Sequence, residues 1–161
     1  MKTSIKFFLF KLLFLVLNVS YAQTPASSVS KADMQNQYVA FLQEEGLLPR
    51  VDTYGDVRFE FQQQSYYIEV HEEDPYFFRM VLMGAWKMEN PELIMKVQDK
   101  CVQVTYATKV CTAFINETEV WFSTESLLAD PQDFKKIFKR SLSSLEACKM
   151  TFLRSIEEQG L

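Results

Sequence analysis

The single histidine of this 161-residue chain, His71, lies among acidic side chains that could share chemistry with it. Glu69 precedes it by two residues, and the acidic run 72–74 follows it directly. A histidine beside carboxylates can transfer protons or bind a metal ion, so this segment is the first candidate for catalysis. However, zinc sites normally need three or four converging ligands, and only Glu69 shares a strand face with His71. We therefore interpret the segment as a strand end followed by a solvated acidic turn.

Other motifs for catalysis or ligand binding are missing from the sequence. It contains no Gly-x-Ser-x-Gly elbow, no phosphate-binding glycine loop and only four glycines in total. A basic run at 135–140 could bind an acidic segment, but such a run on a helix is usually a solvated face. We predict no catalytic residue, no metal and no cofactor, and we expect that the protein is not an enzyme.

Three cysteines, Cys101, Cys111 and Cys148, leave an odd number of thiols. In an oxidising compartment a bridge between Cys101 and Cys111 is one possibility. The alternative, which we favour, is that all three are buried thiols that pack as small apolar residues.

The first 22 residues have the pattern of a signal peptide. Three lysines accompany the apolar stretch 7–17, and the small residues Ser20 and Ala22 fit a cleavage site before Gln23. The pattern predicts export and a periplasmic or secreted protein, cleaved near Ala22. An uncleaved leader that serves as a membrane anchor is the alternative.

Charge and length limit the partners and the number of domains. Residues 1–22 hold three lysines and no acid, so their removal changes the net charge from −4 to −7. This acidity argues against nucleic acid as a partner. No apolar run after the leader reaches the roughly 18 residues of a membrane span. We predict a flexible linker at 23–30 and a single domain at 31–161.

Apolar periodicity predicts an α+β fold. Ser30 is suited to cap a helix at 31–45, which Gly46 would end, and a long helix after Asp130-Pro131 has its apolar side chains at helical spacing. The expected order is α-β-β-β-α-β-β-α, with three helices and a five-stranded antiparallel sheet. The remaining predicted elements are strands at 57–62, 66–71, 76–85, 105–115 and 119–126 and a helix from Asn90-Pro91 through Cys101.

The predicted strand at 76–85 is apolar on both faces, which is unusual for a sheet covered on one side. On one of these faces, its apolar side chains would lie beside large side chains of the neighbouring strands. Such a surface is either a second core or a place where a partner binds. The candidate partner-binding residues are Tyr67, Phe77, Val81, Met83 and Trp121.

Several strings in the sequence resemble the type III secretion chaperone-like fold, in particular its YbjN-like branch. The resemblance covers about residues 31–158, and its strings are structural. It implies an antiparallel sheet flanked by helices, a tendency to dimerise and binding of polypeptides without catalysis. The strings are Val57-Arg58-Phe59-Glu60-Phe61, Tyr66-Tyr67-Ile68-Glu69-Val70, Tyr76-Phe77-Phe78-Arg79-Met80, Val120-Trp121-Phe122-Ser123 and Asp133-Phe134-Lys135 with Ser141-Leu142.

We therefore predict an exported, non-enzymatic interaction module that binds a protein partner or a second copy of itself through the apolar sheet face. A small-ligand-binding protein, or an enzyme that uses His71 and its acidic neighbours, is the alternative. A structural component of the cell envelope is a third possibility.

Overall fold

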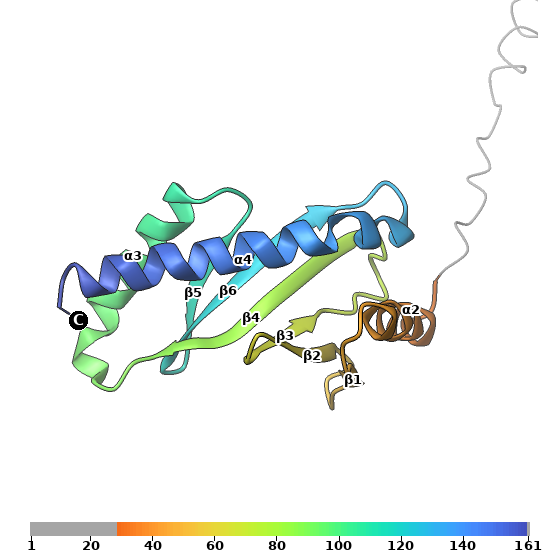
Figure 1. Ribbon diagram of the computed structural model, residues 1–161, viewed down its shortest axis with the longest axis horizontal. Coiled ribbons are helices and arrows are strands. Elements are labelled where there is room, and N and C mark those ends of the chain that lie inside the picture. The colour runs from red at the N-terminus through yellow and green to blue at the C-terminus, as the bar shows by residue number, and fades with distance from the viewer. Residues whose placement is uncertain (1–28, 161) are drawn as a thin grey trace, which may run out of the picture.

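The computed structural model describes residues 29–160 of the chain and shows one α+β domain (Figure 1). The predicted signal peptide and most of the predicted linker lie outside these residues. The sheet is antiparallel throughout, and α4 runs along it beside β4 and β6. The elements are α2 (Lys31–Glu44), β1 (Arg50–Val51), β2 (Val57–Phe61), β3 (Gln64–Ile68), β4 (Phe77–Lys87), α3 (Ile94–Ala107), β5 (Thr112–Asn116), β6 (Glu119–Leu127) and α4 (Phe134–Glu157).

The sheet has six strands in the order β1-β2-β3-β4-β6-β5, so the prediction of five was wrong. The additional strand, β1, has only two residues, which is too short for an alternating pattern to reveal it. The chain turns after α2 and pairs Arg50 with Arg58 and Val51 with Val57. The three predicted helices are present, and the other strands follow the predicted order.

The start and end of α2 are where the sequence predicts them. The Ser30 hydroxyl accepts a hydrogen bond from the backbone N–H of Asp33 and so caps the helix. Gly46 follows the helix end with a φ of +78°, a left-handed conformation that glycine adopts without strain.

The predicted fourth strand was wrong at its beginning, because residues 105–107 belong to α3 and β5 starts only at Thr112. Two threonine hydroxyls hold this junction together. Thr108 Oγ1 donates to the carbonyl of Val104, and Thr105 Oγ1 accepts from the N–H of Ala113. Packing of α3 on the core therefore overrides the strand propensity of this valine- and threonine-rich stretch.

The helices and the sheet enclose one apolar core. The apolar stripe predicted for α4 is buried along its whole length. Within residues 29–160, the buried apolar side chains of all three helices join this core, which lies on one side of the sheet. No helix in this part of the chain is long and apolar enough to cross a membrane. The core side chains of the strands include Phe59, Tyr66, Ile68, Phe78, Met80, Leu82, Val120 and Phe122.

Candidate functional site

The strands present their remaining side chains on the side of the sheet away from the core, which we call the outer face. Because alternate residues of a strand point to opposite faces, the side chains next to the core residues in sequence belong to it. The pairing register places one row of them across five strands. The row runs Arg58, Tyr67, Val81, Ser123 and Thr112.

Val81 lies at the centre of the outer face. It is fully buried, yet it does not belong to the core that the helices cover. Its neighbours on the outer face shield it: Tyr67 is its cross-strand partner on β3, and the Tyr67 ring lies 6.2 Å from the ring of Trp121. These three predicted partner-binding residues are therefore brought together by the fold.

The other two predicted residues lie to either side of this centre. Met83 on β4 pairs with Ser65 and is half-buried. Phe77 is at the start of β4, where its ring packs edge-on against the imidazole of His71 with centroids 5.0 Å apart. Phe77 is thus nearer to the charged end of the outer face than to its aromatic centre.

Phe114 is an outer-face residue that the sequence analysis missed. It pairs with Trp121 across β5 and β6, and the two rings lie 6.4 Å apart. The guanidinium of Arg79 lies 5.9 Å from the Phe114 ring centroid, within cation–π range. The predicted strand at 105–115 already contained Phe114, and its alternation with Ala113, which is buried, is the signal that could have revealed it.

A row of charges borders the aromatic centre. Arg79 contacts two carboxylates, Glu69 at 3.0 Å and Glu125 at 3.2 Å. The contact of its Nε with Glu125 has the distance of an ion pair but not hydrogen-bond geometry, so this nitrogen is buried without a hydrogen-bond partner among residues 29–160. The other oxygen of Glu69 lies 2.7 Å from Nε2 of His71. The row therefore links β3, β4 and β6 through side chains of both signs.

Two hydroxyl groups on the outer face differ from ordinary surface hydroxyls. Burial, followed by the negative charge of Glu69, raises the pKa of Tyr67 to about 12, so its hydroxyl stays protonated and can donate. Ser123 is almost completely buried, and its hydroxyl has no hydrogen-bond partner within the described part of the chain. Buried polar groups are normally satisfied, which makes this hydroxyl unusual.

Fewer acidic side chains contact His71 than its neighbours in the sequence suggest. His71 contacts Glu69, with which it shares a face, as expected. Asp74 instead accepts a hydrogen bond from the backbone N–H of Tyr76 and so stabilises the turn. Among the described residues no group of three side chains is placed to hold a metal ion.

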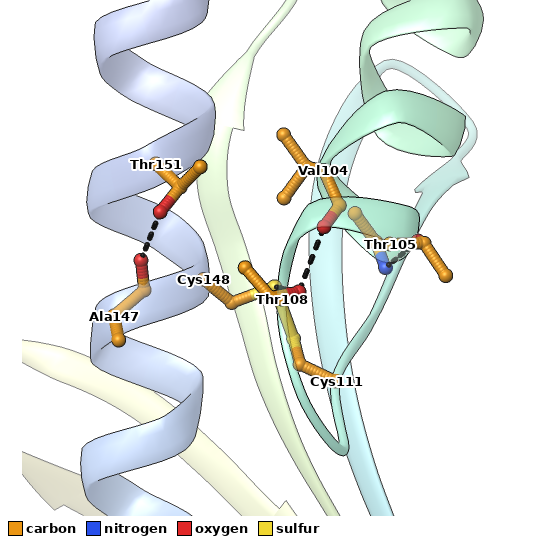
Figure 2. The surroundings of a disulfide bond; sticks show 8 residues. Val104, Thr105, Thr108, Cys111, Ala147, Cys148 and Thr151 are labelled. Carbon is orange, nitrogen blue, oxygen red and sulfur yellow. Dashed lines mark hydrogen bonds between the residues drawn. A yellow bond between two sulfur atoms is a disulfide. The ribbon is translucent and has the colours of Figure 1, made fainter.

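The cysteine pairing differs from both sequence interpretations. Cys111, just before β5, forms a disulfide with Cys148 on α4 (Figure 2). Cys101 is a separate buried thiol. Burial raises the pKa of Cys101 to about 11, so this thiol is unreactive at neutral pH. The preference for three free thiols was wrong, because packing of α4 beside the α3–β5 turn brings together two cysteines that are 37 residues apart.

The basic run at the start of α4 makes ion pairs within the chain. Lys136 contacts Asp133 at 2.6 Å, and Lys139 contacts Glu45 at 2.9 Å. Lys135 lies near the ring of Phe134. These contacts agree with a solvated helix face, because they leave the two paired ammonium groups largely in water.

Neither a family model nor a curated protein matches this chain. Among solved structures, its fold is similar to the crystal structure of YbjN from E. coli, described as "a putative transcription regulator". The TM-score is 0.57 at 10% sequence identity, and the match covers 78% of this chain and 92% of that chain. The chain therefore has a YbjN-like fold, as its sequence strings indicate.

Proposed function

We propose that this protein is an exported, non-enzymatic interaction module that binds a polypeptide through its outer face. The observation that carries the proposal is the cluster of partly exposed aromatic side chains, Tyr67, Trp121 and Phe114, on a sheet face outside the helical core. A sheet face with an apolar centre that no core element covers is a typical place for protein contact.

The composition of the outer face supports this proposal. Protein interfaces combine aromatic and methionine side chains at the centre with a polar rim, and they are enriched in arginine. Here Tyr67, Trp121 and Phe114 form the centre together with Val81, and the charged row through Arg79 forms one border. Because the row contains both positive and negative side chains, it would select a partner whose charged groups are placed opposite charges of the other sign. The net charge of the partner would matter less.

Export is supported by two independent features. Residues 1–22 have the charge and hydropathy of a cleavable leader. In addition, the chain places Cys111 and Cys148 in a disulfide, a bond that persists in oxidising compartments and is rare in the cytosol.

The description of YbjN raises the question of nucleic-acid binding. This chain carries 21 acidic and 17 basic residues, and three of the basic residues lie in the predicted leader. DNA binding depends strongly on neutralising phosphates with lysine and arginine. An acidic mature chain therefore favours a polypeptide partner over DNA.

The test is capture of partners from the cell envelope with the wild-type protein and with outer-face variants. Trp121→Ala should lower the affinity for a captured partner about 30-fold, since truncation of a central interface aromatic side chain costs about 2 kcal/mol of binding free energy. The matched control is Tyr106→Ala, which removes an aromatic side chain that is 87% exposed on α3, a helix that packs on the core side of the sheet. Equal capture by both variants would refute the proposal.

Self-association and the alternative function are tested with the same proteins. Sedimentation velocity at several concentrations shows whether a second copy occupies the outer face, in which case Trp121→Ala shifts the protein toward monomer. The contact between His71 and Glu69 favours the ligand-binding alternative. If His71→Ala abolishes a binding or turnover activity that Trp121→Ala retains, that alternative replaces our proposal.

A further inference from the structure

A pocket of about 520 Å³ lies on the helical side of the sheet, apart from the outer face. It is bounded by the end of α2, the β2–β3 hairpin and the middle of α4. Four apolar side chains, Leu47, Phe61, Phe138 and Leu142, line it. Its volume is within the roughly 300–1,000 Å³ that is typical of small-molecule sites.

The pocket arises from the way the helices divide the sheet. α4 packs on β4 and β6, while α2 packs on β1 and β2, and Phe61 and Gln62 of the β2–β3 hairpin complete the pocket wall. Tyr66, on the strand that pairs with that of Phe61, is held in place beside the pocket. Tyr66 is fully buried, stacks on Phe59 with centroids 5.3 Å apart, and donates its hydroxyl hydrogen bond to Glu146.

Two acidic side chains and one basic side chain line the pocket: Glu45, Glu146 and Lys139. Glu45 directly follows α2, at the end where a helix carries partial negative charge. Glu44 precedes it, and the last turn of α2 contains no basic side chain that would offset these charges. Lys139, on α4, is the cation that contacts Glu45.

The two partners of this ion pair are placed differently. The side chain of Glu45 is 29% exposed, whereas that of Lys139 is 77% exposed. Both side chains line the pocket, and that of Glu45 is the less exposed of the two. An ion pair this exposed contributes about 1 kcal/mol or less, so another cation can replace Lys139 readily.

Glu146, the other carboxylate that lines the pocket, is already occupied. One of its oxygens accepts from the hydroxyl of Tyr66, and the other lies 2.6 Å from Nζ of Lys149. Lys149 is only 14% exposed, so this pair is held in place. Glu45 is consequently the carboxylate that a ligand would engage.

We propose that this pocket binds a small amphipathic cation. The apolar body of the ligand contacts Phe61, Phe138 and the two leucines, and its ammonium group takes the place of Lys139 on Glu45. This site is independent of the polypeptide-binding outer face and goes beyond it.

The proposal is tested by calorimetric titration of the full chain with octylammonium and, as a matched anion, octanoate. Octylammonium should bind with a saturable isotherm and more tightly than octanoate. Glu45→Gln should weaken octylammonium binding by about fivefold at most, because the new ion pair replaces the exposed pair of Glu45 with Lys139. The control is Glu44→Gln, which removes an equal charge one residue away, from a side chain outside the pocket, and should weaken binding less than Glu45→Gln does.

A second variant locates the binding site. Ser143 lies at the exposed rim of the pocket on α4, so Ser143→Phe should fill the pocket without disturbing the core and abolish binding. Circular dichroism checks that each variant is folded. The proposal is overturned if octanoate binds as tightly as octylammonium, if the two glutamate variants behave alike, or if no saturable binding occurs. Retained binding by Ser143→Phe would also overturn it, whereas Trp121→Ala should have no effect on this titration.

Discussion

Reduction of the Cys111–Cys148 disulfide should destabilise the protein strongly. The bond joins residues 37 apart in the sequence. In the chain-entropy description, closing a loop of this length removes about 13 cal/mol/K from the unfolded ensemble, or about 4 kcal/mol at 25 °C. Reduction leaves both side chains in place, so it creates no cavity and isolates the effect of the covalent link.

The assay is urea unfolding of the oxidised and the reduced protein, followed by circular dichroism. We expect the free energy of unfolding to fall by about 4 kcal/mol on reduction, which corresponds to a decrease in Tm of about 10–15 °C for a domain of this size. Thiol titration gives an independent measurement. One thiol, that of Cys101, should react in the unfolded, unreduced protein, and three should react after reduction.

Cys101→Ala is the control, because this thiol is buried but outside the bond. The variant should lose stability through the smaller side chain, yet reduction should destabilise it by the same amount as the wild type. Three reactive thiols before reduction would refute the pairing and remove one of the two arguments for export. A loss below about 1 kcal/mol on reduction would refute the chain-entropy reasoning.

Burial raises the pKa of Tyr38 to about 12, above the ordinary value of 10, so its contribution to stability is present below pH 10 and lost as the pH rises toward 12. Urea unfolding at pH 9 to 11 should show stability falling with pH, and Tyr38→Phe should reduce the slope by on the order of 1 kcal/mol per pH unit; an unchanged slope would contradict this cause. Gly84→Ala should cost about 1–2 kcal/mol in the same assay, because φ is +54° and the added Cβ would lie 3.0 Å from Oε2 of Glu119. Gly46→Ala, at a φ of +78° but with no atom nearby, should cost less, and the reverse order would show that the contact is unimportant. Phe152→Ala should cost about 3–5 kcal/mol, since this fully buried ring packs on two other aromatic rings; a loss below about 1 kcal/mol would mean that the core there is loosely packed.

Local sequence signals predict the elements that have enough length to show a period. The stripe of α4 spans 24 residues, and every apolar position predicted to be buried is buried. Alternation in β3, β4 and β6 likewise assigns Tyr67, Val81 and Trp121 to one face from the sequence pattern alone. These predictions succeed because side-chain direction follows directly from backbone geometry.

Short and contact-dependent features were beyond such reasoning. β1 has two residues, and it exists because the segment after α2 returns to the edge of β2. The start of β5 was misplaced because packing decides whether a stretch rich in valine and threonine is a helix or a strand. Phe114 was also missed, although it lay inside the predicted strand at 105–115 and belongs to the aromatic centre of the outer face.

The sequence by itself determined the α+β class, the order of the long elements and the residue types on each sheet face, because these follow from local periodicity. Only the tertiary structure decided which cysteines pair, how the helices divide the sheet and where a pocket remains beside Glu45. These features join residues far apart in the chain, and their positions depend on how whole helices pack against the sheet. No local pattern carries that information.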